Sequence, residues 1–271
     1  MIRIAIHSVP RSGSSWLGQI FNSSPDVCFR FQPLFSYAFK DYLNKNSSNE
    51  DILKFFKDIS ESNDDFLLQV NRIKNGEYPL FEKKSNFSHI VYKEVRYHNI
   101  LENLLRNDND LKVIGLVRSP FAVINSFLQS PKEFRKDLGW IEKNEWRYSM
   151  KKNLNKEEEF FGYEKWKEVY FLFQRLEKEY KERFCLVYYD DLISNTFLEM
   201  ERIFNFSSLS LDMQTIQFIK GSTSLKNNSV YSVFRKKIND FDWKSTLPYS
   251  ICQEIQEDLF KNKINRFIDA K

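Results

Sequence analysis

The sequence lacks the features that mark membrane, secreted and nucleic-acid-binding proteins. Its apolar runs, such as Ile2 to Ile6 and Val113 to Val117, are far shorter than the roughly 20 residues that span a membrane. Pro10, Arg11 and Ser12 follow the first run, where a signal peptide would have its cleavage region. No dense run of Lys and Arg accompanies the net charge of +4. We therefore expect no membrane span, no signal peptide and no nucleic-acid partner.

Cysteine is also scarce. The three cysteines, Cys28, Cys185 and Cys252, are widely spaced and form no CxxC pair. An odd, scattered set argues against a disulfide framework and for reduced thiols, with Cys185 as a small core residue. We therefore expect a cytoplasmic protein.

Glycine and proline occur only seven times each in 271 residues, so their positions are informative. Hydrophobic residues make up 42% of the chain, which is enough for a substantial core. No linker, repeat or low-complexity segment divides the sequence. We expect one domain over residues 1–271, in which the charged segment 131–163 forms helices or a lid.

Hydrophobic periodicity predicts strands that alternate with helices. Apolar runs predict strands at residues 2–7, 89–93, 111–117 and 184–189, and the third is typical of a central parallel strand. Helical spacing predicts helices near residues 16–22, 49–59, 100–105, 120–128, 194–204 and 251–267, whereas residues 26–39 are predicted to be irregular. This alternation predicts an α/β fold with a central, mostly parallel sheet flanked by helices.

Residues 10–15, with the sequence PRSGSS, join the first strand to the first helix as a candidate anion-binding loop. Gly13 lets the backbone turn sharply, so that N–H groups and the helix N-terminus can face an anion. Arg11 adds a planar guanidinium, and hydroxyl donors come from Ser12, Ser14 and Ser15. A plain turn in which a serine caps the helix has the same composition. The loop alone leaves both interpretations open.

Two common phosphate loops do not fit this segment. The pattern GxxxxGK[ST] needs a lysine, and none follows Gly13. The dinucleotide fingerprint needs three spaced glycines, and only Gly13 and Gly18 are present. A kinase or a dehydrogenase is therefore disfavoured.

The sequence PRSGSSWL at residues 10–17 resembles the 5′-phosphosulfate loop of sulfotransferases that use 3′-phosphoadenosine 5′-phosphosulfate (PAPS), especially their carbohydrate branch. The continuation from Phe21 to Val27 resembles that branch as well. The resemblance implies a P-loop-like sulfotransferase fold. It also implies that residues 11–15 hold the 5′-phosphosulfate and that Trp16 lies near the adenine.

A second segment, LVRSPFAVINS at residues 116–126, resembles the 3′-phosphate motif of the same family. Arg118 ends a strand and Ser126 lies about two turns into the following helix, so both side chains can reach one phosphate. Ser119 stands where Asp is usual and Phe121 where Arg is common. Neither change removes a ligand of the 3′-phosphate.

Two later segments resemble the family more weakly. Residues 187–192 (VYYDDL) resemble its tyrosine–acid–acid–leucine segment. Residues 234–237 (FRKK) resemble a basic loop that closes over the 3′-phosphate in cytosolic members, which implies that Arg235 and Lys236 bind the nucleotide. The usual glycine after Arg-Lys is missing, and a solvated basic loop is the alternative.

Sulfuryl transfer requires stabilisation of charge on the transferring group and on the leaving phosphate. The resemblance assigns this role to Arg11, the loop N–H groups and Lys93, which ends a strand. A strand-end lysine that points into solvent is the alternative for Lys93.

A general base must also take the proton of the acceptor hydroxyl. The carbohydrate branch commonly has a Glu before a Pro after its first helix, but this chain has Gln32 before Pro33. A neutral amide cannot act as that base. We predict Glu94, beside Lys93, as the base, ahead of His7 and His98.

The sequence thus predicts a sulfotransferase that moves the sulfuryl group of PAPS to a hydroxyl group, without a metal ion, and releases 3′-phosphoadenosine 5′-phosphate (PAP). The resemblance implies a glycan or glycolipid acceptor. A catalytically inactive PAP-binding module, which Gln32 would permit, is the alternative. A P-loop-like kinase is less favoured.

Overall fold

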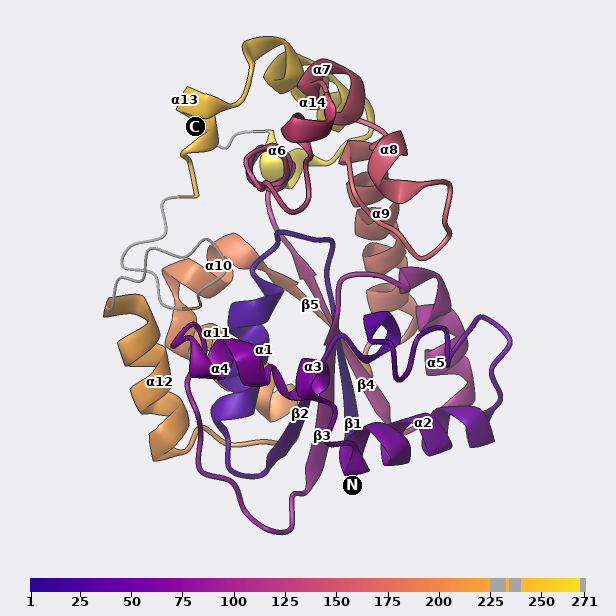
Figure 1. The fold of residues 1–271 in the computed structure, drawn as a ribbon, viewed down its shortest axis with the longest axis vertical. Coiled ribbons are helices and arrows are strands. Elements are labelled where there is room, and N and C mark those ends of the chain that lie inside the picture. The colour runs from indigo at the N-terminus through magenta and orange to yellow at the C-terminus, as the bar shows by residue number, and fades with distance from the viewer. Residues whose placement is uncertain (225–232, 234–239, 269–271) are drawn as a thin grey trace.

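The computed structural model describes residues 1–224, 233 and 240–268. Within these residues, five parallel strands form one sheet in the order β2-β3-β1-β4-β5. The strands are β1 (Ile2–His7), β2 (Val27–Phe31), β3 (His89–Glu94), β4 (Leu111–Val117) and β5 (Phe184–Tyr188). Helices flank the sheet (Figure 1), which confirms the predicted α/β class.

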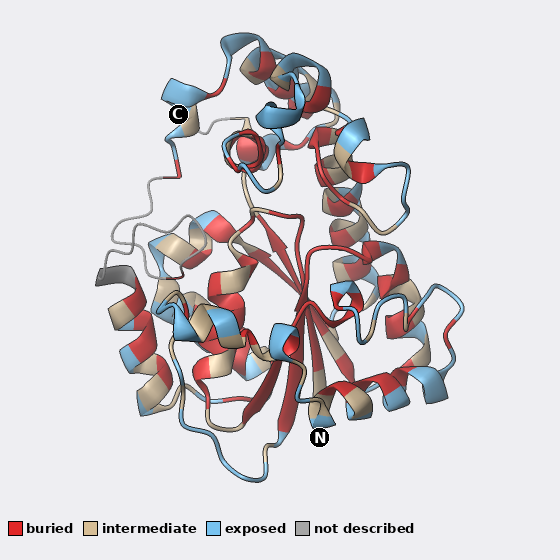
Figure 2. Ribbon diagram, viewed as in Figure 1, coloured by how far each residue is buried: buried red, intermediate tan, exposed pale blue. Residues whose placement is uncertain are grey.

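The helices pack on the sheet through two apolar clusters, one on each face. One cluster joins the sheet to α1 (Ser14–Ser23), α10 (Tyr189–Ser194), α11 (Thr196–Phe206) and α12 (Met213–Ser224). The other joins it to α2 (Asn49–Glu61), α5 (Leu101–Asn107) and α9 (Tyr163–Glu179). The strands are buried almost throughout, and the helices have one buried and one exposed side (Figure 2). This is the burial expected of a parallel sheet covered on both faces.

A further group of helices lies beyond the carboxyl ends of the strands (Figure 1). It contains α6 (Pro120–Leu128), α7 (Glu142–Glu145), α8 (Met150–Asn153), α13 (Trp243–Thr246) and α14 (Tyr249–Lys261). Two more short helices, α3 (Asp65–Leu68) and α4 (Val70–Lys74), follow one another near the β2 edge. Single 3₁₀ turns occupy Pro33–Phe35, His98–Ile100, Lys136–Leu138 and Asn265–Phe267.

Strand β2 lies in the segment that was predicted to be irregular, so that prediction was wrong. The charged residue Arg30 interrupts the apolar run, yet its side chain is buried. The guanidinium donates to the carbonyl oxygens of Ile59 and Ser60, at 2.6 and 2.7 Å, where α2 ends. A helix end thus supplies the acceptors that let an arginine enter a buried strand.

Two helix ends also differ from the sequence prediction. The cap of α2 is Ser48, which shares a capping box with Asp51, rather than the predicted group that begins at Asn49. The last long helix, α14, ends at Lys261, and a separate 3₁₀ turn covers Asn265–Phe267.

The turn at Gly13 depends on the absence of a side chain, which leads to a stability prediction. Gly13 has φ +88°, and a Cβ there would lie 2.3 Å from the ring of Tyr189. Gly139 has a similar φ of +71° with open space around it. We expect Gly139→Ala to lower the free energy of unfolding by about 1–2 kcal/mol through backbone strain, and Gly13→Ala by about 1–3 kcal/mol more through crowding. Urea denaturation of both variants measures the difference, and equal losses would contradict the Tyr189 contact.

Candidate functional site

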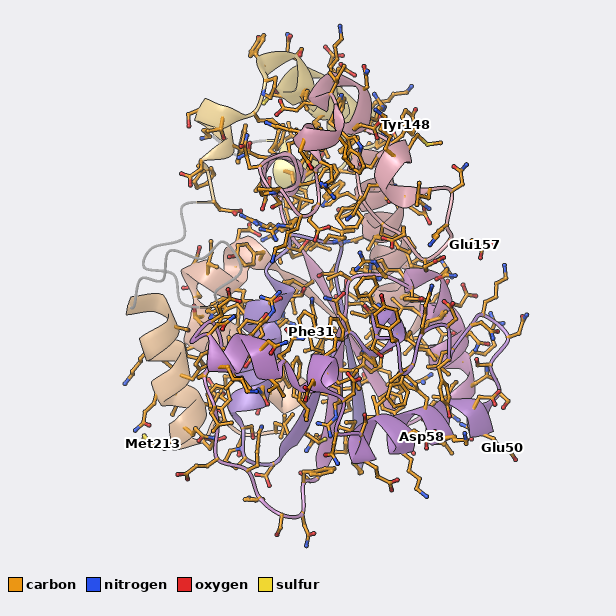
Figure 3. The ribbon with its side chains drawn as sticks, viewed as in Figure 1. Phe31, Glu50, Asp58, Tyr148, Glu157 and Met213 are labelled. Carbon is orange, nitrogen blue, oxygen red and sulfur yellow. The ribbon has the colours of Figure 1, made fainter. Side chains whose placement is uncertain are left out.

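A cavity opens at the carboxyl edge of the sheet. It is lined by the loop after β1, the ends of β2, β3 and β4, and residues of α4, α6 and α10. Parallel strands deliver their carboxyl ends to one edge, which is where open α/β sheets bind ligands. Phe31, which lines the cavity, lies near the centre of the molecule in Figure 3, whereas Tyr148 and Met213 lie at its periphery.

The predicted anion-binding loop forms one wall of this cavity. Arg11, Gly13, Ser14 and Ser15 line it, and the loop runs directly into the N-terminus of α1. Arg11 has φ +71°, a left-handed conformation that costs a residue with a side chain about 1–3 kcal/mol. Ser12 is fully buried and does not line the cavity. The backbone is therefore held in an unusual turn that presents the first N–H groups of α1 to the cavity.

The two segments predicted to bind phosphate are joined by hydrogen bonds. The Nε of Arg11 donates to the Oγ of Ser126 at 3.1 Å, and the Nη1 of Arg118 donates to the carbonyl oxygen of Arg11 at 2.7 Å. All three residues line the cavity. The structure thus brings two guanidinium groups and a hydroxyl group from distant parts of the sequence to one place.

Arg118 makes a further ion pair that the sequence did not predict. Its Nε and Nη2 lie 2.7 and 2.6 Å from the Oδ1 of Asp240, and both side chains are largely buried. Burial raises the pKa of Asp240, and the Arg118 guanidinium opposes that rise. The guanidinium carbon also lies 4.9 Å from the centre of the Tyr189 ring. The Tyr189 ring therefore packs against Arg118 and fills the space that a side chain at position 13 would need.

The remaining residues predicted to bind the nucleotide are only partly described. Trp16 lines the cavity, and its indole N–H donates to the Oγ of Ser222 at 2.9 Å. Arg235 and Lys236 lie outside the described residues.

Lys93 lines the cavity although it is almost fully buried. Its Nζ lies 4.5 Å from the centre of the Phe31 ring, in the geometry of a cation–π contact. Burial lowers the pKa of Lys93 to about 7, with Arg72, Arg96 and Arg11 adding to the decrease and Glu94 opposing it. Burial thus outweighs the counter-charge that Glu94 supplies, and the ammonium group lies at the edge of a cavity lined by Arg11 and Arg118.

Glu94 points to the other face of the sheet, as strand alternation requires. It is fully buried and does not line the cavity. Burial raises the pKa of Glu94 to about 8 and outweighs the opposing effect of Lys93. One carboxylate oxygen accepts from the N–H of Val95 at 3.2 Å, and the other has no hydrogen-bond partner among the described residues. The adjacent Lys93 therefore does not hold the pKa of Glu94 in its usual range.

The two histidines that were weaker candidates for the base form a buried pair. Their Nδ1 atoms lie 3.0 Å apart, which is hydrogen-bond distance, so one ring donates to the other. The Nε2 of His7 lies 3.1 Å from the hydroxyl of Tyr92. Burial lowers the pKa of both rings, that of His7 to about 3. Neither histidine lines the cavity.

Several residues that line the cavity were not predicted from the sequence. Arg72 from α4 lies 5.8 Å from the centre of the Phe31 ring, on a short helix without a periodic pattern. Lys132 and Glu133 come from the segment predicted to be a lid. Glu133 is the only carboxylate among the described residues that line the cavity, and it pairs with Lys152 at 2.7 Å. The sequence shows that these residues are charged, but no neighbouring sequence pattern indicates that they lie near the loop after β1.

Gln32 also lines the cavity, in a left-handed conformation with φ +43°. Its side-chain oxygen accepts from the Nη1 of Arg96 at 3.2 Å, and Arg96 pairs with Glu159 at 2.9 Å. The amide is therefore held by a cation that would equally hold a carboxylate.

Among residues 1–224, 233 and 240–268, no group of three or more His, Cys, Asp or Glu side chains is arranged to hold a metal ion. Over the same residues, no helix has the length and apolar character needed to cross a membrane.

Comparisons with known proteins agree with this geometry. A family model described as a sulfotransferase domain matches residues 2–267. The chain is 24% identical to mouse carbohydrate sulfotransferase 5 over 94% of its length and 78% of that protein, and 23% identical to human carbohydrate sulfotransferase 6 over the same shares.

Solved structures share the fold. The crystal structure of mouse sulfotransferase SULT7A1 complexed with PAP matches with a TM-score of 0.54 and 13% identity, over 97% of this chain and 84% of that one. The sulfotransferase domain of the Synechococcus PCC 7002 olefin synthase matches with a TM-score of 0.53 and 17% identity, over 96% and 94%. Together with the family match, the fold and the joined motifs place this chain in the family of PAPS-dependent sulfotransferases.

Proposed function

We propose that this protein transfers the sulfuryl group of PAPS to a hydroxyl group of a carbohydrate acceptor. The observation that carries the proposal is the junction of Arg11, Arg118 and Ser126 in one cavity at the carboxyl edge of the sheet. The 5′-phosphosulfate is assigned to the loop at residues 11–15 and the 3′-phosphate to Arg118 and Ser126. Trp16 lines the same cavity and is assigned to the adenine side.

In this reaction the acceptor oxygen attacks sulfur, the bond from sulfur to the phosphate oxygen breaks, and a base takes the hydroxyl proton. Negative charge spreads over the transferring group and the leaving phosphate, so preorganised cations stabilise the transition state. Arg11 and Lys93 are the residues assigned to this role. A dianion beside Lys93 would favour its protonated form, because it supplies the counter-charge that burial makes necessary.

A carbohydrate acceptor is supported by the two carbohydrate sulfotransferases among the relatives. Residues 131–163 are proposed to form part of the acceptor side within a single domain, since Lys132 and Glu133 line the cavity. A cytoplasmic location stays a prediction, which the three free cysteines support.

A catalytically inactive PAP-binding module is the second candidate. Gln32 and Val95, both on the cavity wall, cannot accept a proton, and Glu94 lies outside it. The experiments below separate nucleotide binding from transfer, so they distinguish this module from an enzyme.

The first prediction concerns the nucleotide. We expect PAP to bind more tightly than AMP, and Arg118→Ala to remove about 1–3 kcal/mol of that preference, as expected for a charged hydrogen bond. Isothermal titration calorimetry with both nucleotides measures it. Because Arg118→Ala leaves Asp240 without its partner, Ser126→Ala is the companion variant that keeps the ion pair. Equal affinity of the wild-type protein for AMP and PAP would rule out the donor assignment.

The second prediction concerns the planar group of Arg11. Arg11→Lys keeps the charge but loses the guanidinium fork and the contact from Nε to Ser126. We expect sulfuryl exchange between 4-nitrophenyl sulfate and PAP, followed by release of 4-nitrophenol, to slow at least tenfold, in line with the loss of about 1.5 kcal/mol or more. Arg175→Lys, at a half-exposed arginine on α9, is the matched control. A rate within twofold of wild type would show that a point charge suffices.

The third prediction compares two carboxylates as the base. Glu94 stays the residue predicted from the sequence, and Glu133 is the carboxylate that the cavity offers instead. Loss of a general base lowers rates about 10²–10⁴-fold. Because Glu133 lines the cavity and Glu94 does not, we expect Glu133→Gln to show the larger loss in transfer from PAPS to a glycan acceptor, with PAP affinity nearly unchanged. Glu199→Gln, at an ion-paired glutamate on α11, is the control.

A loss of 10² or more in Glu94→Gln alone would instead support Glu94. Gln32→Glu tests the position that the carbohydrate branch commonly uses. Arg96 would hold the new carboxylate at the cavity wall. A higher transfer rate in this variant would show that position 32 is the site of the base and that the amide of Gln32 lowers the activity of the wild-type protein.

A further inference from the structure

Each nitrogen of the Arg118 guanidinium already makes a polar contact within the protein. Nε and Nη2 share the Oδ1 of Asp240 at 2.7 and 2.6 Å, and Nη1 donates to the carbonyl oxygen of Arg11 at 2.7 Å. The side chains of Arg118 and Asp240 are only 14% and 8% exposed. Water therefore screens this pair far less than it screens a surface pair.

Among the residues that the structure describes, Arg118 is the cation that stabilises the Asp240 carboxylate. Burial and the neighbouring Asp190 and Asp242 carboxylates raise the pKa of Asp240, and Arg118 is the residue that opposes them. A buried carboxylate without a cation is costly, so Asp240 has a strong electrostatic reason to stay on Arg118.

A phosphate that binds Arg118 meets this carboxylate in one of two ways. If both anions share the guanidinium, they repel each other across a short, poorly screened distance. If the phosphate takes the place of Asp240, an existing buried ion pair has to be broken. In both cases the contact with Arg118 contributes less to the binding free energy of the phosphate.

We propose that Asp240 is a built-in competitor of the nucleotide's 3′-phosphate for Arg118, so that it weakens binding of 3′-phosphorylated nucleotides and speeds their release. This inference rests on the proposed function, because it takes Arg118 as the 3′-phosphate ligand. Its consequence is kinetic. The product PAP keeps the 3′-phosphate, and product release limits the turnover of many enzymes. A carboxylate that pairs with Arg118 again as the phosphate leaves lowers the barrier to PAP release.

The test is Asp240→Asn, which removes the charge and keeps the shape and a hydrogen-bond acceptor. Titration calorimetry with PAP and AMP gives the affinities, and stopped-flow tryptophan fluorescence gives the rate at which PAP dissociates. We expect the Kd for PAP to fall about tenfold, the Kd for AMP to change less than twofold, and PAP dissociation to slow correspondingly. Asp240→Glu, which keeps the charge, should retain the wild-type Kd within a few-fold.

Asp242→Asn removes the same charge from an exposed residue two positions away and is the matched control. In an Arg118→Ala background, Asp240→Asn should no longer change the ratio of the PAP and AMP affinities. Asp240→Ser provides a second neutral variant if the asparagine variant does not fold, and thermal unfolding of each protein checks this.

Weaker PAP binding in Asp240→Asn would overturn the proposal, because it would show that Asp240 holds Arg118 in position for the phosphate. An unchanged ratio of PAP to AMP affinity would also overturn it, as would an equal gain in Asp242→Asn. Failure of the proposed function has a different signature: the wild-type protein would then bind PAP and AMP equally.

Discussion

The contact between the Arg118 guanidinium and the Arg11 carbonyl oxygen holds the site together. It ties the turn after β1 to the end of β4, and the return contact from Arg11 to Ser126 ties the same turn to α6. These contacts form because β1 and β4 are neighbouring parallel strands, paired from Arg3 with Leu111 to His7 with Gly115. Strand pairing therefore decides that two loops separated by about a hundred residues share one cavity.

A second consequence is the concentration of buried positive charge. Lys93 lies next to the last residue of β3, which pairs with β1 on its other side, so its ammonium group reaches the same cavity as Arg11 and Arg118. Burial lowers the pKa of Lys93, which means that a positive charge at this position is electrostatically costly. An anionic ligand offsets this cost, and binding to the folded state alone stabilises that state by mass action. The charges that would orient a donor thus also explain why a donor should bind.

The cavity has two halves with different structural origins. The half formed by the loop after β1 and the ends of β3 and β4 is fixed by the hydrogen-bonded sheet. The other half comes from α4 and from residues 132 and 133, which belong to short helices and turns. Turns of this kind vary without disturbing the sheet. Under the proposed function, donor recognition belongs to the rigid half, and acceptor choice to the half that contains Arg72, Lys132 and Glu133.

The fold class, four of the strands and the loop at residues 10–15 could be predicted from the sequence, because each is encoded locally. Continuous apolar runs mark β1 and β4, and Gly13 marks a turn that a side chain would disturb. Strand β2 was not predicted because Arg30 interrupts its apolar run. The buried charge of Arg30 depends on carbonyl groups at the end of α2. No local pattern reports such a distant partner.

Which of the candidate catalytic groups line the cavity was decided by tertiary structure in the same way. Alternation along β3 predicts that Lys93 and Glu94 face opposite sides, but only the assembled sheet shows which side holds the cavity. The meeting of Asp240 with Arg118, and of Glu133 with the loop after β1, brings together residues far apart in the sequence. The sequence by itself determined where the turn and the helix N-terminus of the candidate anion site lie, because both are local. Which carboxylates lie near that place was decided by long-range packing, since charge interactions depend on distance in space and not along the chain.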